Sequence, residues 1–186
     1  MMVKLTALIK NEKGTTLAEL IIYAVILVAI LAASYTVYEG SEAIYASSSG
    51  QADAQRSARL AQAQMTKNIR MAESFVTADD TSISLRADID DDNMWDTVNY
   101  YTQNGSLYTK VNNGTAKQIA TGVQNDALNQ PLFTYYNIHF APITTDTASR
   151  KTKSYQIEVN LIIDTDVNRP PDAYTLTSKV MLRNRE

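Results

Sequence analysis

The order of apolar and polar positions divides the chain into three stretches. Leu20–Tyr38 contains no charged residue, and as an α-helix its 19 positions would be about 28 Å long, close to the thickness of a bilayer's hydrocarbon core. The next stretch is rich in Ala, Gln, Arg and Met, and its apolar residues recur at steps of three and four, which predicts an amphipathic helix. That apolar stripe consists of Ala58, Ala61, Met65, Ile69, Ala72 and Val76. Arg56, Arg59, Lys67 and Arg70 lie on the other side.

These two stretches predict one long helix from about Thr15 to Ser74. Gly40 and Gly50 each cost about 1 kcal/mol relative to Ala, so a bend or local melting is expected at one of them. The alternative is two separate helices joined by a flexible linker at Ser47–Gly50.

Beyond Phe75 the apolar period changes to two, which predicts antiparallel strands with one buried face. Asn104-Gly105 is a hairpin signal, and Asn112-Asn113-Gly114 predicts a second turn. Tyr100-Tyr101 and Tyr135-Tyr136 should each place one ring in the core and one outside. The expected strands are residues 81–87, 96–102, 106–111, 117–123, 131–140, 154–164 and 173–183.

The predicted fold class is therefore α+β, with one long N-terminal helix packed on an antiparallel β-sheet. The expected organisation is a basic leader (1–14), a transmembrane helix (15–38), an amphipathic helix half (39–76) and a β-sheet head (77–186).

Charge and cysteine content exclude some classes of function and predict the membrane topology. Residues 1–14 carry a net charge of +2 and the rest about −5; the positive-inside rule predicts a single-pass protein of the cytoplasmic membrane with an exported C-terminal domain. The acidic body argues against nucleic-acid binding. The basic groups of the body, Lys67, Arg70, Arg183 and Arg185, are expected to be solvated. The chain has no cysteine, which excludes disulfides and thiolate metal sites.

Glu19 is the unusual feature, because it places a carboxylate just inside the apolar run. A secretory signal peptide would have a shorter apolar core, and its only cleavage pattern here, Ala32-Ala33-Ser34, is weak. A plain signal anchor leaves Glu19 unexplained, since a lone carboxylate at membrane depth costs about 2.5–3.5 kcal/mol. The third interpretation is a leader cut after Gly14, which makes Glu19 the fifth residue of the mature chain.

The sequence Gly14-Thr15-Thr16-Leu17-Ala18-Glu19-Leu20, after a basic leader and before an apolar helix, resembles the class III leader of type IV pilins and type II secretion pseudopilins. The family usually has Phe or Met at the position of Thr15. The resemblance implies the pilin fold, cleavage after Gly14 by a prepilin peptidase and N-methylation of Thr15. It also implies filament assembly through Glu19, Leu17 and Leu20, with Glu19 neutralising the N-terminal amine of a neighbouring subunit.

The implied partners are other pilins or pseudopilins, an inner-membrane platform protein and a motor ATPase. The implied location is a pilus or pseudopilus, in the periplasm or at the cell surface. The segments MTKNIRMAESF, LRADIDDDNMWDTVNYYTQNGSLYTK, IATGVQN, PLFTYYN and VMLRN, in this order, are similar to J-type minor pseudopilins and W-type minor pilins. The alternative function is a membrane-anchored or filament-tip binding module for a surface, a secreted substrate or DNA.

Other candidate chemistry is sparse, and no enzymatic activity or cofactor is expected. Asp88, Asp90, Asp92 and Asp96 are the only candidate metal ligands, for calcium. Asn93 stands where a calcium loop needs Gly, which favours a solvated acidic turn. His139, the single histidine, has no recognisable catalytic motif around it.

Overall fold

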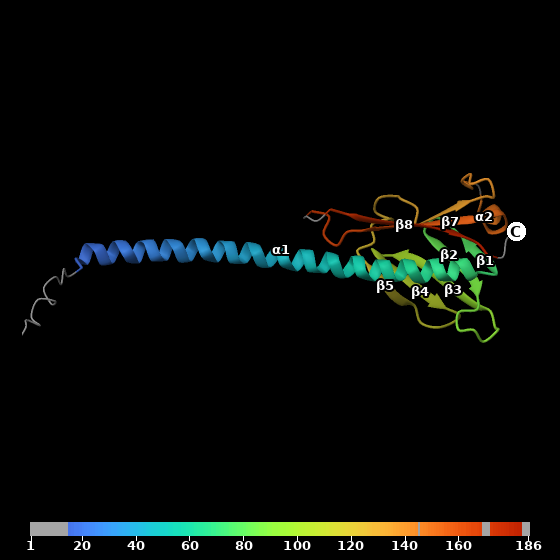
Figure 1. Ribbon diagram of the computed structural model, residues 1–186, viewed down its shortest axis with the longest axis horizontal. Coiled ribbons are helices and arrows are strands. Elements are labelled where there is room, and N and C mark those ends of the chain that lie inside the picture. Colours follow the sequence, from blue (N-terminus) through green and yellow to red (C-terminus); the bar gives the residue numbers. More distant parts are fainter. Residues whose placement is uncertain (1–14, 145, 169–171, 184–186) are drawn as a thin grey trace, which may run out of the picture. The chain divides into compact units, whose positions relative to one another are not determined.

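The computed structural model describes residues 15–144, 146–168 and 172–183, apart from the side chain of Ala43. It confirms the α+β class: one long helix packs through its C-terminal part on antiparallel β-structure (Figure 1). The chain divides into two compact units, residues 1–45 and 46–186. The second unit, called the head from here on, therefore contains the amphipathic part of the helix as well as the strands.

Helix α1 (Leu17–Met71) is 55 residues long. Its α-helical hydrogen bonding continues through Gly40 and Gly50, so neither the local melting nor the Ser47–Gly50 linker is found. Helix propagation is cooperative, and good helix formers on both sides offset the cost of an isolated glycine.

The helix ends three residues before the predicted Ser74. Glu73 donates its N–H to the carbonyl of Arg86 at 2.8 Å, which draws the chain into sheet pairing. Val76, predicted to continue the helical stripe, lies in strand β1 (Ser74–Ala78) and is 46% exposed. The C-terminal end of the helix is completed by Arg183, whose N–H donates to the carbonyl of Arg70 at 3.4 Å.

The strands form two antiparallel sheets. The first has the order β1-β2-β3-β4-β5 and the second β6-β7-β8. Their bounds are β2 (Ser82–Ala87), β3 (Asp96–Gln103), β4 (Ser106–Val111), β5 (Lys117–Thr121), β6 (Phe133–Tyr136), β7 (Gln156–Ile163) and β8 (Tyr174–Met181), with a short helix α2 (Thr147–Lys153) before β7.

The predicted turns are confirmed by backbone geometry. Asn104 and Gly105 both have positive φ, 49° and 68°, as the tight hairpin between β3 and β4 requires. Asn112 has φ 49° at the turn between β4 and β5. Strand β6 is shorter than expected, because the Asn137 side chain accepts hydrogen bonds from the N–H groups of His139 and Ala141 and so closes a turn.

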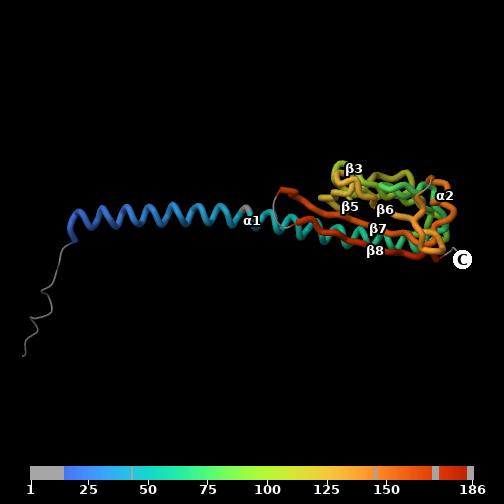
Figure 2. Tube along the Cα trace, turned by 90° about the horizontal axis from the view of Figure 1, so that it is seen from above, coloured from blue at the N-terminus to red at the C-terminus, as the bar shows by residue number. Residues whose placement is uncertain are grey.

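The core lies between α1 and the two sheets. Figure 2 shows the backbone of these elements from a second side. The predicted stripe from Ala58 to Ala72 is buried, and so are the alternating residues of β7. Tyr100 and Tyr135 are buried while Tyr101 and Tyr136 are half-exposed, as the alternation predicted. A buried side-chain amide fixes the packing. Gln51 donates to the carbonyl of Ile163 and accepts from the N–H of Thr165.

We expect Met65→Ala to destabilise the head by about 2–5 kcal/mol, because it leaves a cavity under a fully buried side chain. Leu60→Ala is the matched control on the same helix, since Leu60 is 66% exposed; it should change stability by less than about 0.5 kcal/mol. Urea unfolding of the full chain in detergent, followed by Trp95 fluorescence, measures both. Equal effects of the two substitutions would contradict this description of the core.

Candidate assembly site

Glu19 makes a reciprocal cap with Thr16 at the start of α1. The Thr16 N–H and hydroxyl donate to Oε2 of Glu19 at 2.8 and 3.1 Å, and the Glu19 N–H donates to the Thr16 hydroxyl at 3.3 Å. This is a capping box, in which a Thr and a Glu three residues later satisfy each other's orphan donors. The pattern was present in the sequence as Thr16-Leu17-Ala18-Glu19, but the sequence interpretation did not use it.

The capping box gives Glu19 a structural role within its own chain. The presence of Glu19 therefore has a local explanation even if the helix is a plain membrane anchor. Only Oε2 accepts a hydrogen bond among the described residues, so Oε1 remains open to another donor. Leu17 and Leu20, the other expected assembly residues, lie beside it with 78% and 55% of their surface exposed.

The apolar part of α1 is exposed on all sides. Its large apolar side chains between Leu17 and Tyr38 are 51–78% exposed, and this part of the helix is long and apolar enough to cross a membrane. The hydroxyls of Ser34 and Thr36 donate to the carbonyls of Ile30 and Ala33, both at 2.8 Å. Such internal bonds satisfy polar side chains where water is absent.

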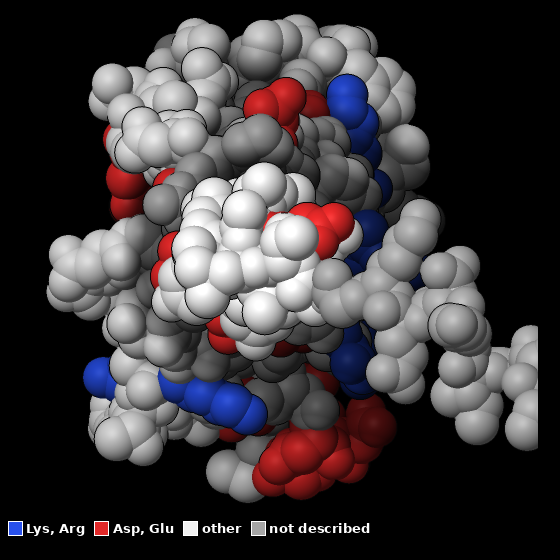
Figure 3. Space-filling model, turned by 90° about the vertical axis from the view of Figure 1, so that its left-hand side faces the viewer, with Lys and Arg blue, Asp and Glu red and all other residues white. Residues whose placement is uncertain are grey.

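Gly14, the expected cleavage position, lies outside the residues that the structure describes, as does the leader. Thr15, the expected first residue after cleavage, is described and exposed. It immediately precedes the capping box. Figure 3 looks onto this end of the helix, where the nearest described side chains are mostly uncharged.

The acidic turn brings together three of the four candidate calcium ligands. Carboxylate oxygens of Asp88, Asp90 and Asp92 lie within 4.8 Å of one another. Asp96 instead accepts a hydrogen bond from the Asn112 amide at 2.6 Å. Desolvation, followed by the negative charges of Asp92 and Asp96, raises the pKa of Asp90. The two oxygens of Asp88 accept the N–H groups of Asp92 and Asn93, which accounts for its position without an ion.

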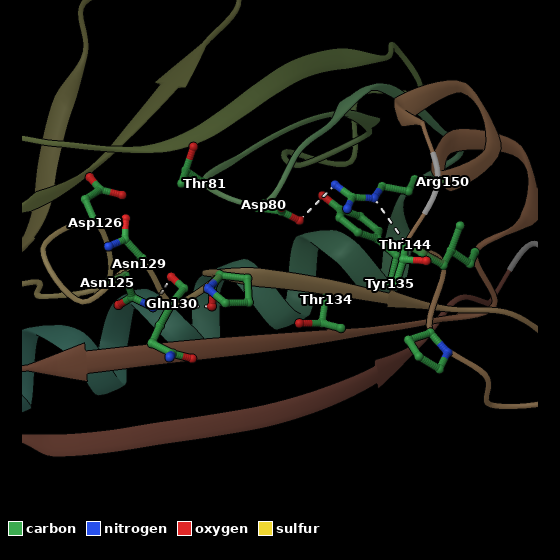
Figure 4. A pocket seen from close by; sticks show the side chains of 13 residues that line it. Asp80, Thr81, Asn125, Asp126, Asn129, Gln130, Thr134, Tyr135, Thr144 and Arg150 are labelled. Atoms are coloured by element: carbon green, nitrogen blue, oxygen red, sulfur yellow. Dashed lines mark hydrogen bonds and ion pairs between the residues drawn. The ribbon is translucent and has the colours of Figure 1, made fainter.

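The head also contains a polar cleft of about 560 Å³ (Figure 4). At one end the Arg150 guanidinium is 2.9 Å from the Asp80 carboxylate, donates to the carbonyl of Ile143 at 3.2 Å and lies over the Tyr135 ring. At the other end are the side chains of Asp126, Asn129 and Gln130. This cleft could not be predicted from the sequence, because its lining combines loops with residues of β6 and α2 that are distant in the sequence.

His139 lies in the exposed Asn137–Ala141 turn, outside this cleft. The turn also contains Phe140 with a positive φ of 57°. The sequence also contains no signal for the buried amide side chains. Asn125 donates to the carbonyl of Asn160 at 2.7 Å and accepts the N–H of Ile162 at 3.0 Å, which extends β7 pairing across the boundary of the two sheets.

No protein-family model matches this sequence, and comparison with curated proteins gives no significant match.

The burial of Tyr100 predicts that the stability of the head decreases at alkaline pH. Burial raises this pKa from 10.0 to about 12, against the opposing hydrogen bond from Asn68. The unfolded chain therefore loses the phenol proton first, and the stability that the protonated phenol contributes is lost as pH rises from 10 to 12. We expect a decrease of about 1 kcal/mol per pH unit from this residue.

Tyr100→Phe should be less stable at neutral pH, because the Asn68 amide loses its acceptor, but its stability should fall less steeply between pH 10 and 12. Urea unfolding at several pH values measures the slope for both chains. An identical slope would show that Tyr100 does not titrate as its burial requires.

Proposed function

We propose that this chain is a structural subunit, a minor pilin or pseudopilin, of a type IV pilus or type II secretion-like filament. The observation that carries the proposal is a membrane-length helix, exposed on all sides, with one carboxylate in its first turn. A single anchor in lipid needs no such charge, whereas a bundle of identical helices can use one. The α+β head built around the same helix supports the same proposal.

Assembly in this proposal begins with cleavage after Gly14 by a prepilin peptidase, which gives Thr15 a free amine. In a bundle of apolar helices this ammonium would be buried, and an unpaired buried charge is very unfavourable. Oε1 of Glu19 on a neighbouring subunit is an available acceptor. The pair would set the axial register of the subunits more than it would add stability. Leu17 and Leu20 would pack around it, and a platform protein and motor ATPase would drive assembly.

A second candidate function is a membrane-anchored or filament-tip binding module. The cleft of the head favours it, because carboxylate, amide and hydroxyl groups line this cavity of about 560 Å³. This function is compatible with assembly, since the cleft and the apolar helix are in different units.

The leader predicts a defined N-terminus. When the chain is expressed with a prepilin peptidase, intact-mass analysis should find a protein that begins at Thr15, with or without one added methyl group. Gly14→Val should leave residues 1–14 attached, because the peptidase recognises the small residue before the cut. A wild-type chain that keeps its leader in the presence of active peptidase would contradict the proposal.

The capping and assembly roles of Glu19 can be separated by two substitutions. Glu19→Gln keeps the capping box, because Gln also serves at this position, but removes the charge. Thr16→Val removes the cap, at about 1 kcal/mol of helix stability, and keeps the charge. We expect Glu19→Gln to be inserted and cleaved normally but to enter filaments at least tenfold less, whereas Thr16→Val should assemble nearly as well as wild type.

Filament yield is measured by shearing and sedimentation, with total membrane-inserted chain as the reference. The opposite ranking, normal assembly of Glu19→Gln and failure of Thr16→Val, would assign Glu19 to helix capping alone.

A further inference from the structure

The solvent-exposed side of α1 in the head carries a row of cations. At 3.6 residues per turn, Arg56, Arg59, Lys67 and Arg70 fall within about 80° of one another and extend over about 21 Å. All four are exposed. Arg183 joins the row at the end of the helix, where its N–H donates to the carbonyl of Arg70.

A groove of about 380 Å³ lies at the C-terminal end of this row. It is lined by Lys67, Arg70 and Arg183 together with Ala63, Thr66 and Met71; this surface is called the basic groove below. In the described part of the chain, the two ion pairs formed by side chains use Arg150 and Lys179, so none of the three cations of the groove is neutralised. The lining has no aromatic ring, which single-stranded nucleic acid would need for base stacking.

The head also carries a surface of complementary charge. The turn at residues 88–95, between β2 and β3, contains Asp88, Asp90, Asp91 and Asp92. No cation forms an ion pair with these carboxylates among the described residues, and their mutual repulsion contributes to the raised pKa of Asp90. The turn ends with two exposed apolar side chains, Met94 at 69% and Trp95 at 51%. A partner surface with cations around apolar side chains would reduce the repulsion between the carboxylates and would cover Met94 and Trp95.

We propose that the basic groove of one copy receives the 88–95 turn of a second copy. The carboxylates of the turn would face Lys67, Arg70 and Arg183, while Met94 would lie against Ala63 and Met71. The choice of partner rests on the assembly function proposed above. Because the contact joins two different surfaces, it is heterologous, and its repetition adds copies in one direction, as a filament requires. Exposed ion pairs are individually weak, so this contact selects register while the apolar helices supply affinity.

Disulfide crosslinking tests the contact directly, because the native chain has no cysteine. Two differently tagged full-length copies, one with Thr66→Cys and one with Met94→Cys, are expressed together with the assembly machinery and oxidised in membranes. We expect a disulfide-linked dimer that carries both tags. Leu128→Cys replaces Met94→Cys as the control, since Leu128 is also exposed, at 52%, but lies in another loop; it should crosslink at least fivefold less.

Charge reversal then distinguishes a specific contact from collision. Lys67→Glu with Arg70→Glu in the Thr66→Cys copy should lower crosslinking at least fivefold. Asp90→Lys with Asp92→Lys in the Met94→Cys copy should restore it, which a merely damaged head could not do. Crosslinking that is absent, or that charge reversal leaves unchanged, would overturn the proposal. It would also be overturned if single-stranded DNA or anionic vesicles, and not the second copy, protected Lys67 from chemical acetylation.

The outcome is separable from that of the assembly function. Filaments that still depend on the charge of Glu19 but show no Thr66–Met94 crosslink would refute the head contact alone.

Discussion

The packing of residues 51–71 of α1 against the two sheets is the constraint on which the head depends. Ala54, Ala58 and Ala61 let the helix backbone approach the strands closely, and Met65 and Ile69 fill the space beyond them with no exposed surface. The chain has no disulfide to share this role. The buried Gln51 adds direction to an otherwise apolar contact: its amide joins the helix to the end of β7 and to Thr165. A buried amide with good partners costs little, whereas a shifted helix would leave it unsatisfied.

A buried amide with good hydrogen-bond partners also joins the two sheets. Val123 and Ile163 form an isolated bridge between them, and Asn125 continues that pairing with its side chain instead of its backbone. Asn125 is fully buried, so its hydrogen bonds are made in a low-dielectric environment where an unmade bond is expensive. These hydrogen bonds fix the position of one sheet relative to the other. Asn125 also lines the cleft of Figure 4, so they fix this part of its lining as well.

Patterns that repeat over many residues were predictable from the sequence. The helical stripe, the alternating β7 residues and the Asn-Gly hairpin depend on periodicity or on one backbone conformation that few residues adopt. Features set by single hydrogen bonds were not predictable in this way. Strand β1 exists because Ser74–Ala78 pairs with β2, and α2 because Asp146 caps the N–H of Ser149. The cleft and the basic groove combine residues distant in the sequence, so their positions depend on the completed fold. The cleavage and assembly roles at the N-terminus remain predictions.

The capping box accounts for only part of the chemistry of Glu19. A cap of this kind contributes about 1 kcal/mol, whereas a lone carboxylate costs up to about 2.5–3.5 kcal/mol, the value at the centre of a membrane helix. Gln would make the same hydrogen bonds to Thr16 and would be easier to bury. Local structure therefore explains why position 19 holds a side chain that accepts hydrogen bonds, but not why that side chain is charged. The helix dipole supplies part of the answer, because it favours negative charge in the first turn. In the proposed assembly, the cation that reaches Oε1 is the N-terminal amine of a neighbouring subunit, which cleavage after Gly14 would create.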